Sequence, residues 1–154
     1  MCIDNVLHRA AGPRLREACR RQMQTRPHGL PAGGPPIITP GFALAACHVC
    51  HVTGPCVDRT APIPLLAQQQ LASCYSGVLD AAAAAGFKSL AFCCISTGLF
   101  GYDSSAAAVV AATTVREWLL RRSGGGALTT VVFDVFTDAD AQAYAHAMAL
   151  AFPA

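Results

Sequence analysis

The second half of the chain alternates between short apolar runs and longer alanine-rich segments. Residues 89–95 and 129–136 are continuous apolar runs, as expected of strands buried on both faces. Between and after them, apolar residues recur at helical spacing, from Ala108 to Leu119 and again after Thr137. A strand, a helix and a second strand in this order require a right-handed crossover and a mainly parallel sheet. The alternation therefore predicts an α/β sandwich.

The first half of the chain predicts shorter elements separated by proline and glycine. Apolar stripes predict two helices, one from Ile3 and one from Pro13, because a Gly-Pro pair interrupts the first pattern. Short strands are predicted at residues 37–39 and 49–52, with loops rich in proline and glycine before and after them. A long helix is predicted around residues 71–82.

Composition excludes several classes of protein. The 154 residues suit one compact domain, and 53% hydrophobic against 13% charged residues exclude intrinsic disorder. A formal net charge of +2 lacks the basic excess of nucleic-acid-binding proteins. No apolar run reaches the roughly 18 residues of a membrane span. Cys74, Cys93 and Cys94 lie within hydrophobic runs, which favours free thiols in a reducing compartment. We therefore expect a cytoplasmic protein that binds neither nucleic acid nor membranes.

The segment Ser96-Thr97-Gly98-Leu99-Phe100-Gly101-Tyr102 joins a predicted strand to a predicted helix. Open α/β sheets bind ligands at this end of their strands. Two glycines allow the backbone to approach a ligand closely, and exposed N–H groups beside a helix N-terminus favour phosphate. Phe100 and Tyr102 are candidates to wall off a sugar or a base. An ordinary strand-to-helix turn explains the two glycines equally well.

Several segments, in order along the chain, resemble the macrodomains, a family that binds ADP-ribose. Residues 89–102 resemble the diphosphate-binding loop of that family, and residues 4–13 resemble the helix after its first glycine-rich loop. Residues 37–55 match the next two strands, and residues 131–144 match the last strand and helix. The resemblance implies a three-layer α/β/α sandwich with a mixed, mainly parallel sheet. We expect one such domain over residues 1–154.

Within the family, Cys2-Ile3-Asp4-Asn5 and residues 92–98 look most like a zinc-dependent branch that removes ADP-ribose from acidic side chains of proteins. The resemblance implies that Cys2 is one zinc ligand and that Asp4 is an active-site acid. Zinc needs three or four protein ligands, of which Cys2 supplies one. Phe136 would stack on the adenine. The ligand-binding residues implied by the resemblance are Asn5, Ser96, Thr97, Gly98, Leu99, Phe100, Gly101, Tyr102 and Phe136.

The chain departs from the family at its amino end. The family has further strands before the point that matches Cys2, one of which lies between the strands that correspond to Val49 and Phe92. We therefore expect a macrodomain that is truncated at its amino end. In such a domain the strands of Val49 and Phe92 either pair directly or leave unpaired edges that invite association.

Other residues allow alternative interpretations. Residues 47–51, Cys-His-Val-Cys-His, fit the haem-attachment pattern or a small zinc knuckle, although the family has an ordinary strand there. The Cys93-Cys94 pair favours core packing over a redox role. His8 acts as a base or packs on an apolar helix face. Asp4 caps its helix, positions a water near the ribose, or does both.

Three functions are compatible with these residues. The first is an enzyme that hydrolyses mono-ADP-ribose from acidic side chains of modified proteins. The second is a module that binds ADP-ribose without cleaving it. The third is a truncated fragment with neither activity. The expected partners are ADP-ribose or a mono-ADP-ribosylated protein.

Overall fold

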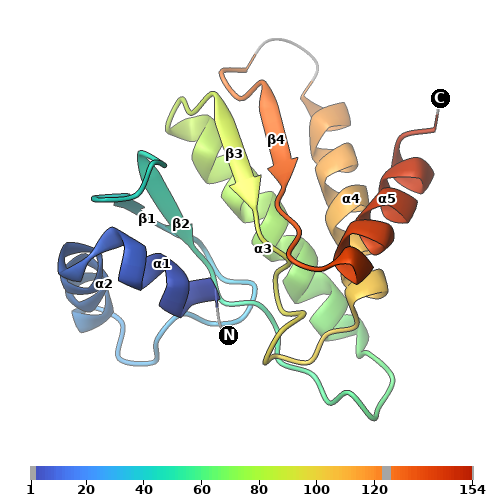
Figure 1. Cartoon of the computed structure of the whole chain (residues 1–154), viewed down its shortest axis with the longest axis horizontal. Coiled ribbons are helices and arrows are strands. Elements are labelled where there is room, and N and C mark those ends of the chain that lie inside the picture. The colour runs from blue at the N-terminus through green and yellow to red at the C-terminus, as the bar shows by residue number, and fades with distance from the viewer. Residues whose placement is uncertain (1–2, 123–125, 154) are drawn as a thin grey trace.

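The computed structural model describes residues 3–122 and 126–153 (Figure 1). The predicted order of helices and strands is confirmed, although the strands are shorter than their apolar runs, and residues 93–95 and 134–136 lie outside any strand. The elements of the described residues are α1 (Ile3–Ala11), α2 (Pro13–Gln24), β1 (Ile37–Pro40), β2 (His48–His51), α3 (Leu65–Ala84), β3 (Ser89–Phe92), α4 (Ser104–Arg121), β4 (Thr130–Phe133) and α5 (Asp138–Ala151).

The strands of the described residues form two separate pairs. β1 and β2 are antiparallel, with Ile37 opposite His51, and β3 and β4 are parallel, with Phe92 opposite Phe133. Within the described part of the chain, β2 and β3 do not pair with each other. The predicted mixed sheet is therefore divided, and the edges of β2 and β3 that lack a neighbouring strand are the unpaired edges anticipated from the sequence (Figure 1).

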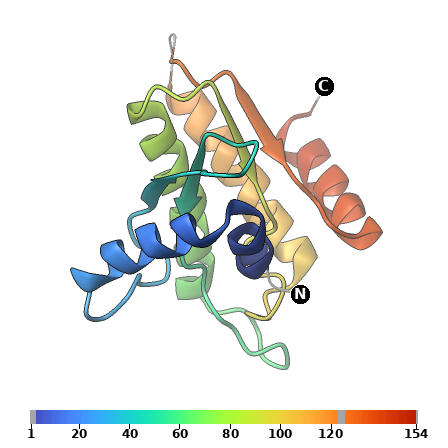
Figure 2. The same cartoon turned by 60° about the vertical axis from the view of Figure 1, so that its left-hand side comes forward.

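Two contacts connect the strand pairs at the ends of β2 and β3. At the amino ends, the His48 ring stacks on the Phe87 ring with 4.6 Å between centroids. Beyond the carboxyl ends, Gly54 lies so close to Ser96 that an ideal Cβ on the glycine would be 2.1 Å from the serine Oγ. Because each contact joins corresponding ends, β2 and β3 run in the same direction, as Figures 1 and 2 show.

Helices lie on both faces of the strands and make three layers. On one face, α2 packs against β1, and Cys19 Sγ lies 3.8 Å from His51 Nε2. Neighbouring residues of a strand point to opposite faces. Cys50 accordingly packs against the hydrophobic core on the side of α3. The α/β sandwich predicted from the sequence is therefore confirmed.

The hydrophobic core is centred on α3, which packs against α4, while α4 packs against α5. Tyr75 of α3 is fully buried and meets Phe92 edge-on at 4.9 Å between ring centroids. The Phe133 ring lies 5.0 Å from the Tyr144 ring of α5, and the hydroxyl groups of Tyr75 and Tyr144 are 3.2 Å apart. These rings attach β3 and β4 to two helices at once. The described residues include no helix with the length and apolar character needed to cross a membrane.

The expectation that residues 89–95 and 129–136 are buried on both faces is wrong. Phe92 is buried and Phe133 is half-buried, but Ala91 is exposed and Val132 is 47% exposed. Helices α3, α4 and α5 all lie on the side of the sheet that carries the phenylalanines (Figure 1). Alternate side chains of β3 and β4 therefore point away from the core, and an apolar run cannot reveal which of its two faces a helix covers.

We predict that Gly54→Ala destabilises the protein. Besides the approach to Ser96, the added Cβ would lie 2.7 Å from Cγ2 of Ile95. Overpacking of this kind costs about 1–3 kcal/mol of unfolding free energy. Chemical denaturation measures the change, with Gly77→Ala as the control. The Cβ at Gly77, within α3, would meet Pro36 Cδ at an ordinary 3.5 Å. Equal unfolding free energies for the two variants would contradict the close approach at Gly54.

Candidate functional site

The segment 96–102 leaves β3 and enters α4 as a compact loop with unpaired amides. The Tyr102 amide donates to the Ser96 carbonyl at 3.0 Å, and the Gly101 amide donates to the Gly98 carbonyl at 3.2 Å. Ser96 has a φ of 69°, a left-handed conformation that turns the chain sharply. Among the described residues, the four successive amides of residues 97–100 have no hydrogen-bond acceptor. A row of free amides at such a turn forms a concave site for an anion.

The next helix adds to the positive character of this loop. Asp103 is the N-cap of α4, where its carboxylate accepts a hydrogen bond from the Ala106 amide at 2.8 Å. The cap fixes the amino end of α4 directly after the loop, and a helix amino end carries partial positive charge. The loop and the helix therefore present donors and a favourable dipole to an anion.

The chain that follows β2 packs directly against this loop. The Val57 amide donates to the Phe100 carbonyl at 2.8 Å, and Arg59 Nη2 donates to the Gly98 carbonyl. Gly101 has a φ of 79°, and a Cβ on it would lie 2.6 Å from the Val57 carbonyl oxygen. Position 101 therefore requires glycine both for its positive φ and for the close approach of the Val57 carbonyl.

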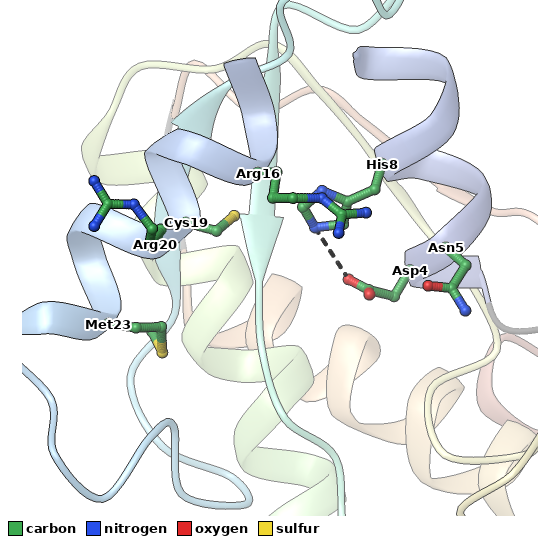
Figure 3. Close-up of a pocket in the computed structure, with 7 residues that line it drawn as sticks. All are labelled: Asp4, Asn5, His8, Arg16, Cys19, Arg20 and Met23. Atoms are coloured by element: carbon green, nitrogen blue, oxygen red, sulfur yellow. Dashed lines mark ion pairs between the residues drawn. The ribbon is translucent and has the colours of Figure 1, made fainter. Parts of the chain in front are cut away.

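The amino end of α1 lies beside the same loop, as the two views in Figures 1 and 2 agree. Asp4 is 65% exposed, and its Oδ1 lies 3.6 Å from Nε2 of His8, one turn later. His8 is mostly buried, and its Nδ1 has no hydrogen-bond partner among the described residues. Figure 3 shows this pair with Asn5 at a cavity of about 330 Å³, whose other wall is Arg16, Cys19, Arg20 and Met23 of α2. The cavity combines a carboxylate, an imidazole and guanidinium groups.

The structure does not gather the side chains of residues 47–51 at one point, as a haem-attachment or zinc site would require. Cys50 and His51 point to opposite faces of β2, and His48 stacks on Phe87. The His51 Nε2 and Thr39 Oγ1 are 2.8 Å apart, and burial, with a smaller contribution from His8, lowers the pKa of His51. The regular alternation of a strand separates side chains that a knuckle would bring together. Within the described part of the chain, no three His, Cys, Asp or Glu side chains are placed to hold a metal ion.

The cysteines at the end of β3 are half-buried. Burial raises the pKa of Cys94 to about 11, with a smaller effect from Asp140. The thiolate is the reactive form of cysteine, so this shift disfavours a redox role at neutral pH. The packing interpretation of the Cys93-Cys94 pair is therefore the better one.

The structure separates the predicted ligand-binding residues into exposed and buried groups. Leu99 is 83% exposed, Phe100 40% and Phe136 94%, so all three apolar side chains are available to a ligand. Tyr102 is 1% exposed, and its ring belongs to the core. The expectation that Tyr102 walls off a sugar or base is therefore wrong, because its ring is buried in the core, although its amide donates to the Ser96 carbonyl and closes the loop. Cys2, the predicted zinc ligand, lies outside the described residues.

Comparisons with known proteins agree with this geometry. The Macro domain family model matches residues 1–111. The chain is 42% identical over 148 residues to a Fusarium oxysporum f. sp. cubense protein named "Probable bifunctional ADP-ribose hydrolase/ADP-ribosyltransferase", covering 93% of this chain and 24% of that protein. It is 38% identical over 148 residues to a protein-ADP-ribose hydrolase of Staphylococcus aureus, covering 95% of this chain and 53% of that protein. The chain thus spans about half, or less, of these relatives.

Solved structures show the same fold. The Oceanobacillus iheyensis macrodomain with ADP matches with a TM-score of 0.87 at 30% identity, over 97% of this chain and 76% of that chain. The Trypanosoma brucei macrodomain in complex with ADP-ribose matches with a TM-score of 0.75 at 31% identity, over 94% of this chain and 55% of that chain. The three-layer fold predicted from the resemblance is therefore confirmed.

We predict that Gly101→Ala is more damaging than Gly29→Ala. Both glycines have a positive φ, 79° and 71°, so both variants bear a backbone strain of roughly 1–2 kcal/mol. The alanine at position 101 would also collide with the Val57 carbonyl, whereas nothing lies within 4 Å at position 29. Urea denaturation and amide exchange at Tyr102 measure the difference. Similar stability and exchange in both variants would contradict the close approach of the Val57 carbonyl to Gly101.

Proposed function

This chain belongs to the macrodomain family, and from that premise we propose that it binds ADP-ribose and hydrolyses mono-ADP-ribose from acidic side chains of modified proteins. The observation that carries the proposal is the row of free amides at residues 97–100, directly before the amino end of α4. A diphosphate is an anion with many acceptor oxygens, to which backbone N–H groups donate hydrogen bonds. The protein-ADP-ribose hydrolase name of the S. aureus relative supports the reaction.

The remaining parts of ADP-ribose are assigned to residues around the loop. Phe136 is almost fully exposed and follows β4, which neighbours β3, so its ring can stack on the adenine. Asn5, exposed in the first turn of α1, offers an amide to the ribose. Phe100 and Leu99 would cover the diphosphate from the solvent side. Leu99 and Phe100 follow the carboxyl end of β3, and Phe136 follows that of β4. Ligands bind at these strand ends in α/β folds.

We assign the hydrolytic step to Asp4. Its carboxylate accepts a hydrogen bond from a water and orients that water towards the anomeric carbon of the proximal ribose. The water oxygen forms a bond to this carbon, while the bond to the modified carboxylate breaks. The products are free ADP-ribose and the restored acidic side chain, with one proton released. His8, 3.6 Å from Asp4 Oδ1, holds the carboxylate in place.

A reader that binds without cleaving is the second candidate function. The amides of the loop and the exposed Phe136 need no titratable group to bind ADP-ribose. By contrast, the catalytic proposal depends on Asp4, which is largely exposed and is paired with His8. Binding and turnover must therefore be measured separately.

We also propose a reducing, cytoplasmic location and no nucleic-acid or membrane partner. Among the described residues, these cysteines are free thiols: Cys19, Cys47, Cys50, Cys56, Cys74 and Cys94. Free thiols persist in reducing compartments. The net charge of +2 offers little attraction for a polyanion.

The proposed function predicts heat on titration of the chain with ADP-ribose and much less with AMP, which lacks the second phosphate.

Asp4→Asn should keep this binding and lower release of ADP-ribose from a carboxylate-modified protein by about 10²–10⁴-fold, the range for lost acid–base catalysis. Asp138→Asn is the matched control, because Asp138 is also an exposed aspartate in the first turn of a helix. Binding without turnover in the unmodified chain would favour the reader. A folded chain that does not bind would favour the inactive fragment.

The zinc content of the chain, for which the resemblance implies Cys2 as one ligand, is a separate prediction. Because the described residues gather no three metal ligands and zinc sites need three or four, we derive no step through zinc. We expect the chain and its Cys2→Ser variant to contain the same low amount of zinc by elemental analysis. More zinc in the unmodified chain would show that Cys2 belongs to a complete site.

A further inference from the structure

Residues 55–59, here called the wall segment, make three contacts with residues 96–102, here called the glycine loop, and no sequence pattern predicts these contacts. The Val57 amide donates to the Phe100 carbonyl, and the Val57 carbonyl lies against Gly101. The third contact is the hydrogen bond from Arg59 Nη2 to the Gly98 carbonyl. Two of these contacts use backbone groups of the segment, and the third uses a side chain. Arg59 is therefore the point at which a substitution can loosen the loop without altering the chain path.

The Arg59 guanidinium has no carboxylate partner among the described residues. The neighbouring carboxylate of Asp58 instead accepts hydrogen bonds from the amide and hydroxyl of Thr60, at 2.8 and 2.7 Å. The ion pairs of the described residues involve other cations. The positive charge of Arg59 thus lies next to the loop, and no carboxylate of the described residues is within ion-pair distance of it.

Peptide geometry links Arg59 to the free amides. The described chain contains no cis peptide, so the carbonyl of Gly98 and the amide N–H of Leu99 point in opposite directions. When Arg59 holds this carbonyl on its side, the Leu99 N–H points away from the wall segment. The same carbonyl accepts the Gly101 amide at 3.2 Å, so one acceptor orients two peptide units of the loop.

We propose that Arg59 is a positioning residue for diphosphate binding, which acts by holding the Gly98 carbonyl and by adding an unneutralised positive charge beside the loop. This inference rests on the proposed function, since the anion is the diphosphate of ADP-ribose. Fixing the amides before the ligand arrives lowers the ordering cost of binding. The guanidinium also acts on the anion through its field, which salt weakens.

The test compares Arg59→Gln and Arg59→Lys with the unmodified chain. Arg59→Gln should weaken ADP-ribose binding about ten-fold, the effect of one lost charge-assisted hydrogen bond. It should also speed hydrogen exchange at the Val57, Gly101 and Tyr102 amides in the absence of ligand. Arg59→Lys retains the charge and should recover part of the affinity. Arg26→Gln is the matched control, because Arg26 Nη1 donates to the Gln22 carbonyl at 2.8 Å on the surface after α2.

Each result bears on the inference. Weaker binding and faster exchange in Arg59→Gln, both absent in Arg26→Gln, would support it. Unchanged affinity and exchange would overturn it and leave the proposed function intact. Faster exchange with unchanged affinity would limit Arg59 to a structural contact and also overturn it. If the unmodified chain does not bind ADP-ribose, the proposed function fails by itself, and with it the role of Arg59 in binding.

Discussion

The close approach of Gly54 to Ser96 is the contact on which the arrangement of the site depends. Within the part of the chain that the structure describes, the two strand pairs share no ladder of hydrogen bonds, so their relative position rests on a few contacts at the ends of β2 and β3 and on α3. A side chain at position 54 would push the chain after β2 away from the chain after β3. The approach therefore brings the wall segment to the glycine loop and fixes where the free amides lie.

The second constraint is the aromatic core around Tyr75. Its fully buried ring contacts Phe92, and its hydroxyl meets that of Tyr144, so α3, β3 and α5 are held by one side chain. Aromatic rings bury much area and prefer specific geometries, which makes such a contact rigid. The core thus supports the strand from which the loop emerges, while the loop itself carries the polar groups. This division between a packed support and a surface loop is common at ligand sites.

The same arrangement leaves strand edges and apolar side chains exposed. Among residues 3–122 and 126–153, β2 and β3 each have one edge without a neighbouring strand, and the outer face of β3 and β4 exposes Ala91 and Val132. Unpaired strand edges offer backbone donors and acceptors to other chains. The glycine loop lies beyond the carboxyl end of β3. The gap between β2 and β3 therefore does not interrupt the loop.

The sequence by itself determined the order of elements, the α/β class and the family, because apolar spacing and the glycine-bearing segment 96–102 are local signals. Asp4 and Phe136 are both exposed in the structure, although the apolar run that includes Phe136 predicted a buried strand. Only the tertiary structure decided which face of β3 is covered, why Tyr102 turns into the core, and that Arg59 reaches the Gly98 carbonyl 39 residues away. Those outcomes depend on contacts between distant segments, and no local periodicity records which segments meet.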